Sequence, residues 1–247
     1  MSKKSVIIIA SSVIAVALIA GGFYYYVNYF TQPKLPIAEI PEVPTEDLKD
    51  PARIEKIVAF TVKSNSLTAE QIAGVQESFI KLTDFFRQHQ GEIISYETLM
   101  RMAALKQAVG DYEGARDIYL YVYQLDPNGY LVQGNLAALD TYELHNYAEA
   151  EKFYHLAITK AESGNLLSYY QGLIEVYKTG FNDNEKAKAA IAEAIDRLPT
   201  SITMQITAAE FYKSIGDKKT AMKYYQNALA IDPTSEAAKV GLESLSK

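Results

Sequence analysis

The same spacing of alanine, a bulky residue, a small residue and proline recurs along the C-terminal part of the chain. Pro127, Pro199 and Pro233 each follow an alanine by twelve residues, a bulky apolar or aromatic residue by eight and a small residue by five. A fourth copy keeps these intervals ahead of Glu162, which takes the place of proline. The four sets are Ala115, Tyr119 and Val122; Ala150, Tyr154 and Ala157; Ala187, Ile191 and Ala194; and Ala221, Tyr225 and Ala228. Their alanines lie 35, 37 and 34 residues apart, which is the signature of a stacked repeat architecture.

Each copy predicts two antiparallel helices joined by a short polar turn. The turns GDYEGA (110–115) and GDKKTA (216–221) place a glycine that ends one helix before an aspartate that caps the next. Small residues let the two helices approach closely, the bulky residue fills the space between them, and proline ends the second helix. One such unit cannot bury its apolar face alone, but stacked units can. The sequence therefore predicts an all-α solenoid of about four helix pairs.

These motifs resemble the tetratricopeptide repeat family over residues 96–235. The last copy fits the family's scheme well, with its characteristic small, aromatic and terminating residues at Ala208, Ala209, Tyr212, Ala221, Tyr225, Ala228 and Pro233. The third copy carries about one extra residue in its turn around Phe181. The resemblance implies a repeat domain over residues 92–247 that ends in a short capping helix at 236–247.

Two further helices are predicted before the repeats. Asp50 and Pro51 suit the N-cap and first position of a helix near 52–63. A second helix, at about 69–89, begins with the capping box of Thr68 and Gln71 and stops at Gly91. Its apolar stripe is Ile72, Val75, Phe79, Leu82 and Phe86. We interpret residues 52–91 as an N-terminal cap or a degenerate repeat, and a dimerising coiled coil formed by the stripe is the alternative.

The N-terminal residues have the composition of a membrane anchor. Val6 to Val27 is a nearly continuous apolar run without charge, long enough to cross a hydrocarbon core of about 30 Å as a helix. We predict a cytoplasmic N-terminus (1–5) carrying Lys3 and Lys4, a transmembrane anchor (6–30), and an extracytoplasmic remainder. The alternative is a signal peptide cleaved after Ala15-Val16-Ala17, which would give a secreted protein. Residues 31–51 hold five of the chain's eight prolines and predict an extended linker.

No motif predicts catalysis or a cofactor. The chain has no cysteine and a formal net charge of −6, and it lacks the clustered lysine and arginine that nucleic-acid binding needs. Phosphate-binding loops, nucleophile elbows, zinc motifs and calcium loops are absent from the sequence. His89, His145 and His155 are not spaced as a metal pair, and the latter two are predicted at the surface. We therefore predict no enzyme, no cofactor, no metal and no nucleic-acid partner.

Function is expected on the surface. The resemblance implies that the first helix of each pair lines a concave groove for a segment of another protein. The groove positions are Met100, Ala104 and Gln107; Asn135, Leu139 and Tyr142; Gln171, Glu175 and Lys178; and Ile206, Glu210 and Lys213. Tyr121 and Tyr123 are predicted as an aromatic patch on the opposite, convex face.

Our hypothesis is a membrane-anchored protein-interaction scaffold outside the cytoplasmic membrane, acting in envelope, secretion or pilus-type assembly. The alternatives are a coat that self-assembles into homo-oligomers and a subunit of an enzyme complex.

Overall fold

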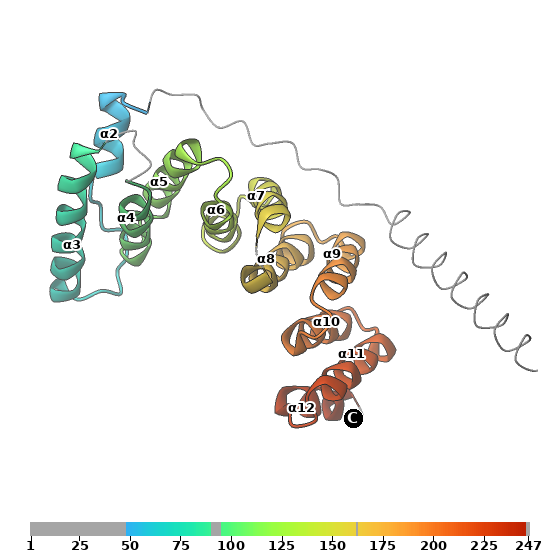
Figure 1. Cartoon of the computed structure of the whole chain (residues 1–247). Helices are drawn as coiled ribbons and strands as arrows, with labels where there is room; N and C mark the ends of the chain where they lie inside the picture. Colours follow the sequence, from blue (N-terminus) through green and yellow to red (C-terminus); the bar gives the residue numbers. More distant parts are fainter. Residues whose placement is uncertain (1–47, 90–94, 162, 246–247) are drawn as a thin grey trace, which may run out of the picture. The chain divides into compact units, whose positions relative to one another are not determined.

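The computed structural model describes residues 48–89, 95–161 and 163–245, all within the compact unit Ala38–Lys247 (Figure 1). In these ranges all regular structure is helical. In chain order the helices are α2 (Pro51–Val58), α3 (Ala69–Gln88), α4 (Tyr96–Ala108), α5 (Tyr112–Leu125), α6 (Tyr130–Tyr142), α7 (Tyr147–Lys160), α8 (Ser163–Glu175), the π-helix η2 (Val176–Gly180), α9 (Asn184–Arg197), α10 (Ile202–Ser214), α11 (Lys218–Ile231) and α12 (Glu236–Leu245).

The predicted membrane anchor at 6–30 lies outside the described residues, as do the N-terminus at 1–5 and the linker up to residue 47. No helix in the described ranges is both long enough and apolar enough to span a membrane.

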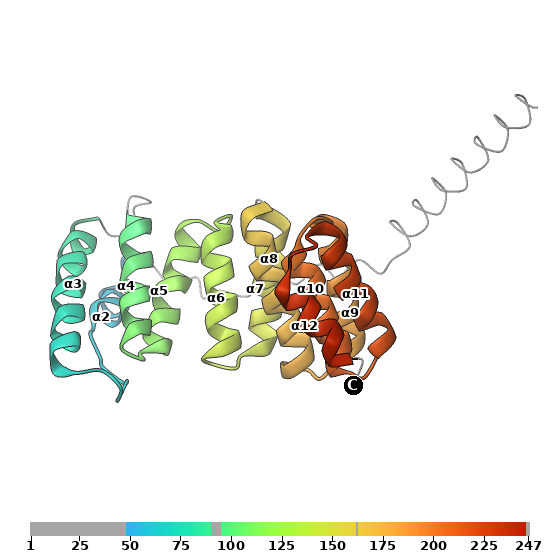
Figure 2. The same ribbon diagram turned by 90° about the horizontal axis from the view of Figure 1, so that it is seen from below.

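Four helix pairs follow one another, as the repeat spacing predicts. α4 packs against α5, α6 against α7, α8 against α9 and α10 against α11. In Figure 1 the first helices of the pairs lie on the inner side of the bend that this stack makes, and the second helices lie on its outer side. Figure 2 shows α4 to α8 following one another in chain order. α12 packs against α11 and α10, so the predicted capping helix is confirmed.

The recurring residues form the interior between the helices. The alanines at the start of each motif, the bulky residues and the small residues that follow them are all buried. In the second and fourth pairs the bulky residue is a tyrosine that packs against a glycine of the following helix. A Cβ added to Gly172 of α8 would lie 2.0 Å from the Tyr154 hydroxyl of α7, and one added to Gly241 of α12 would lie 2.2 Å from the Tyr225 ring of α11. Neighbouring pairs therefore approach closely because glycine leaves room for a tyrosine ring.

The Gly-Asp turns have the predicted geometry. Gly110 and Gly216 have φ angles of 78° and 82°, which glycine adopts without a steric cost. The Asp111 carboxylate accepts a hydrogen bond from the Gly114 backbone, and that of Asp217 accepts one from Thr220. Each aspartate thus caps the second helix of its pair.

The extra residue of the third pair is absorbed by a π-helix. η2 continues α8 with a wider turn, which is the usual way in which a helix accommodates one inserted residue. Asn182 then reverses the chain with a φ of 51°. The insertion changes the turn and leaves the packing of α8 on α9 intact.

α2 is shorter than predicted. Asp50 caps it and Pro51 opens it as expected, but it ends at Val58 instead of continuing to residue 63. Beyond it, Phe60 packs against Phe79 of α3, with ring centroids 5.2 Å apart. The backbone N–H groups of Lys63 and Ser64 both donate to the Val109 carbonyl at 2.8 Å. These tertiary contacts replace the helical hydrogen bonds that residues 59–63 would make.

α3 packs within the chain. Its capping box of Thr68 and Gln71 is confirmed, and it ends at Gln88, while Gly91 lies outside the described residues. Phe79 and Phe86 are buried, α3 packs against α4, and Arg87 pairs with Glu55 of α2 at 2.9 Å. The centre of the apolar stripe is therefore covered by the chain's own repeats, which argues against a coiled coil.

The predicted aromatic patch on the convex face is wrong, because Tyr121 and Tyr123 are buried. The Tyr121 hydroxyl donates to the Leu48 carbonyl at 2.8 Å, and its ring meets Phe86 edge to face. Tyr123 packs in the same way against Phe153. Tyr121 is hidden by a segment 73 residues earlier in the chain, a contact that helical periodicity does not encode.

Candidate protein-binding surface

Each first helix of the four pairs leaves some of its side chains exposed or half-buried. We call these side chains the first-helix surface. Of the twelve predicted groove residues, eleven belong to it: Met100, Ala104, Gln107, Asn135, Tyr142, Gln171, Glu175, Lys178, Ile206, Glu210 and Lys213. They lie on α4, α6, α8 with η2, and α10, on the inner side of the bend in Figure 1.

Leu139 was predicted to line the groove, but its side chain is only 2% exposed. α6 packs against α5, α7 and α8, so only a narrow strip of it remains open. That strip consists of Leu131, Asn135, Ala138 and Tyr142, which recur at helical spacing of three and four residues. Leu131 and Ala138 were not predicted, although counting back by four from Asn135 would have found Leu131.

The apolar part of the surface centres on α6. Tyr142 is 53% exposed and Leu131 is 45% exposed, and both are among the large apolar residues that the fold leaves in contact with solvent. Partial burial of the Tyr142 phenol, and next the nearby Glu175 carboxylate, raise the pKa of its hydroxyl. The hydroxyl therefore stays protonated at neutral pH and can donate a hydrogen bond.

The charged part lies on α8, η2 and α10, and its charges are paired. Lys178 lies 3.9 Å from Glu175, and Lys213 lies 3.6 Å from Glu210. Between the two pairs, the Gln171 amide donates to the Thr207 hydroxyl at 2.9 Å and links α8 to α10. Because the charges compensate each other, this half offers polar contacts without a strong net field.

The histidines do not form a reactive site. His145 is exposed in a turn, as predicted, where its ring contacts the Thr141 carbonyl and the Tyr147 hydroxyl. The prediction for His155 is wrong, because this ring is half-buried and lies 3.0 Å from the Tyr177 hydroxyl. Within the described ranges, no group of three or more histidine, cysteine, aspartate or glutamate side chains could hold a metal ion.

Asp140 is the buried carboxylate that most resembles a catalytic group. Burial raises its pKa, which the Arg116 guanidinium and the Asn146 amide partly oppose. Arg116 donates to it at 2.7 Å and Asn146 at 3.1 Å. These contacts tie α6 to α5 and to the turn before α7, so the arrangement holds helices together and offers no second reactive group.

The comparisons with known proteins agree with this architecture. A model of the tetratricopeptide repeat matches residues 202–235, which contain α10 and α11. The fold is an all-α repeat solenoid of tetratricopeptide type. No curated protein matches the sequence.

Solved structures with a similar fold include BtubC (BKLC) from P. vanneervenii, with 20% identity, a TM-score of 0.56, and 72% of this chain and 84% of that chain covered. Another is MamA 41-end from Desulfovibrio magneticus RS-1, with 20% identity and a TM-score of 0.53; the match covers 65% of this chain and 87% of that chain. A further MamA crystal structure has 17% identity and a TM-score of 0.52; the match covers 64% of this chain and 94% of that chain. Solenoids of this type generally serve as protein-interaction scaffolds.

Proposed function

We propose that the protein is a non-catalytic, membrane-anchored scaffold that binds a segment of a partner protein along the first-helix surface. The observation that carries this proposal is the exposed apolar strip of α6, where Leu131 and Tyr142 lie on the same side of the helix. Exposed aromatic and aliphatic side chains of this kind are typical anchors of interfaces. The charge pairs on α8, η2 and α10 continue the surface and would set the register of the bound segment.

The proposal is tested by affinity capture from detergent-solubilised native membranes. The test variant combines Leu131→Glu and Tyr142→Glu, which places two charges on the α6 strip. The matched control combines Val240→Glu on α12 and Ile80→Glu on α3, two exposed positions outside the first-helix surface. We expect the natural protein and the control to retain the same partner and the test variant to lose it, with unchanged circular dichroism in all three. Equal capture by the two variants would show that this surface does not bind the partner.

The membrane anchor is a separate part of the proposal and rests on the sequence of residues 6–30. Lys3 and Lys4 ahead of the apolar run favour a cytoplasmic N-terminus and extracytoplasmic repeats. Because the chain has no cysteine, single cysteines can report its orientation. We expect Val240→Cys to react with a membrane-impermeant maleimide in intact spheroplasts and Ser2→Cys to react only after lysis. The opposite pattern would place the repeats in the cytoplasm.

We further propose that the scaffold acts in envelope, secretion or pilus-type assembly. An anchored repeat domain on the outer side of the membrane would be positioned to hold such components near the bilayer. The identity of the captured partner tests this role, because a partner confined to the cytoplasm would exclude it.

A further inference from the structure

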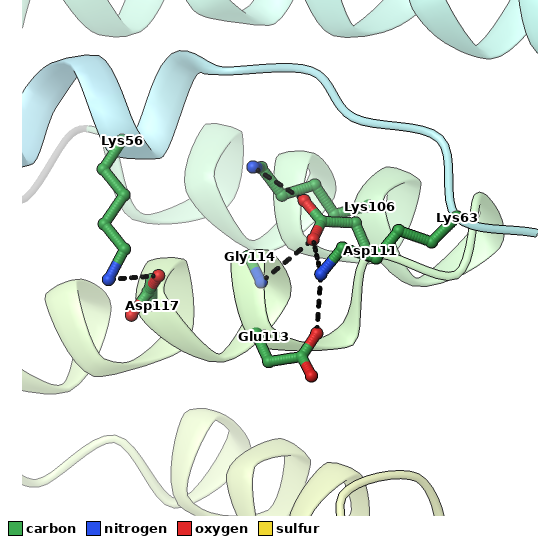
Figure 3. Close-up of polar contacts among 7 residues, drawn as sticks. All are labelled: Lys56, Lys63, Lys106, Asp111, Glu113, Gly114 and Asp117. Carbon is green, nitrogen blue, oxygen red and sulfur yellow. Dashed lines mark hydrogen bonds and ion pairs between the residues drawn. The ribbon is translucent and has the colours of Figure 1, made fainter.

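The chain binds an extended segment of its own at the turn of the first pair. We call residues 59–64 the strap. Its Lys63 and Ser64 backbone N–H groups donate to the Val109 carbonyl at 2.8 Å. The Lys63 ammonium lies 3.0 Å from Asp111 and 2.8 Å from Glu113, and Lys56 of α2 lies 2.9 Å from Asp117 (Figure 3). The α4–α5 turn and α5 thus bind a basic segment through acidic side chains.

The turn of the last pair, between α10 and α11, has the same backbone conformation as the turn between α4 and α5. It lies 106 residues later, as the separation of Pro127 and Pro233 shows. The φ angles of Gly110 and Gly216 are 78° and 82°. The Asp111 and Asp217 backbones donate to the carbonyls of Lys106 and Tyr212 at 2.8 and 2.9 Å. The two turns therefore offer equivalent backbone surfaces.

The first turn is covered and the last one is open. A Cβ added to Gly110 would lie 2.9 Å from the Ser64 nitrogen of the strap, whereas one added to Gly216 would meet nothing within 4 Å. The last pair therefore leaves accessible the surface that the strap occupies on the first pair.

The charge at the equivalent positions is reversed. Lys219 and Lys223 of α11 stand where Glu113 and Asp117 stand in α5, and Lys218 precedes them. All three lysines are exposed, and among the described residues none has a carboxylate within ion-pair distance. The other five lysines between residues 164 and 245 each pair with a glutamate: Lys178, Lys186, Lys188, Lys213 and Lys239.

The lysines of α11 are also unfavourably placed within their own helix. The first turn of α11 contains no acidic residue, so two cations lie at the positive end of the helix dipole. Asp217, the N-cap, places one negative charge beside these lysines and accepts the Thr220 backbone N–H at 3.0 Å. One carboxylate does not balance two lysines and the positive end of the helix dipole, so an external anion would compensate the remaining positive charge.

We propose that the α10–α11 turn and the exposed face of α11 bind an acidic, extended segment of a partner protein. The strap shows that this type of turn accepts an extended peptide, and the reversed charges select an acidic one. Met222, which is also exposed on α11, adds an apolar contact. Because α11 is a second helix, this site does not belong to the first-helix surface and goes beyond the function proposed above.

The test uses two labelled peptides and fluorescence anisotropy with the purified full chain at low salt. One peptide is residues 54–66 of this sequence, and the other is the same peptide with Lys56→Glu and Lys63→Glu. The test variant is Lys219→Glu with Lys223→Glu. The matched control is Lys81→Glu with Lys239→Glu, which changes the net charge equally at one exposed and one half-buried lysine outside α11.

We expect the acidic peptide to bind the natural protein and the control, and to bind the test variant at least tenfold more weakly. The unchanged peptide should show the reverse preference and favour the test variant. Failure of the acidic peptide to bind, or equal binding by test variant and control, would overturn the proposal. So would binding to phosphatidylserine vesicles alone that depends on Lys219 and Lys223, because the ligand would then be a lipid surface.

Discussion

The close contact between neighbouring helix pairs predicts opposite effects for two glycine-to-alanine substitutions in the same helix. Gly172 and Gly164 both belong to α8. A Cβ at position 172 would lie 2.0 Å from the Tyr154 hydroxyl and 2.1 Å from its ring carbon Cζ, whereas one at position 164 would meet nothing within 4 Å. Tyr154 is buried, so its ring has little room to move away.

The magnitude follows from two terms. Replacing glycine by alanine inside a helix stabilises it by about 0.5–1 kcal/mol. Overpacking a filled interior costs about 1–3 kcal/mol, and a contact near 2 Å with a buried ring belongs at the upper end. Gly164 is the second residue of α8, where only part of the interior gain applies. We therefore expect Gly164→Ala to stabilise the protein by at most about 0.5 kcal/mol and Gly172→Ala to destabilise it by about 2 kcal/mol. The latter corresponds to a melting temperature lower by about 4–8 °C.

Urea and thermal unfolding followed by circular dichroism measure both effects. Tyr154→Phe removes only the hydroxyl, and the ring carbon would still be too close, so it should rescue Gly172→Ala only in part. Tyr154→Leu should remove most of the additional penalty in a double-mutant cycle. If Gly172→Ala is as stable as Gly164→Ala, the close approach of α7 and α8 described here is incorrect.

Three further predictions concern the first turn, a buried ion pair and a histidine. Gly110→Ala should lower the urea midpoint more than Gly216→Ala does. Both substitutions force alanine into a left-handed conformation, but only the first also displaces the strap. Equal decreases in the urea midpoint would contradict the strap contact. Asp111→Asn keeps an N-cap but leaves the Lys106 ammonium, which is 2% exposed and 3.1 Å away, without its buried counter-charge. We expect the free energy of unfolding in urea to fall by about 3 kcal/mol and Lys106→Met to restore most of it. An unchanged free energy of unfolding would show that the pair is not buried. Burial lowers the pKa of His155 below its ordinary value of 6.5, so the unfolded chain binds the proton more tightly than the folded chain. Stability should therefore fall as the pH drops below about 6.5, and His155→Gln should weaken this dependence. If His155→Gln leaves the pH profile of the urea midpoint unchanged, the prediction is refuted.

The sequence predicts the features that depend on local spacing. The recurrence of alanine, bulky residue, small residue and proline is set within single helices, and it led to the four pairs. The capping helix followed from the resemblance to the tetratricopeptide repeat family. The extra residue near Phe181 indicated a changed turn, although not that the turn would be a π-helix.

The features that the sequence did not predict depend on distant contacts. The strap joins Lys63 to Val109, and Tyr121 is buried under Leu48 and Phe86, so neither follows from the periodicity of one helix. Leu139 is a different case. Its exposure depends on how α6 is rotated between its neighbours. Consecutive helical residues point about 100° apart, and in the structure Leu139 is buried while Ala138 is half-buried.

The central claim, that the first-helix surface binds a protein partner, is tested most directly by site-specific photocrosslinking in intact cells. A photoreactive phenylalanine analogue would replace Tyr142 on the α6 strip and, as the control, Val240 on α12, which is 62% exposed. We predict one discrete protein adduct from position 142 that is absent from position 240 and disappears when Leu131→Glu is added. No adduct from position 142, or the same adducts from both positions, would contradict the claim.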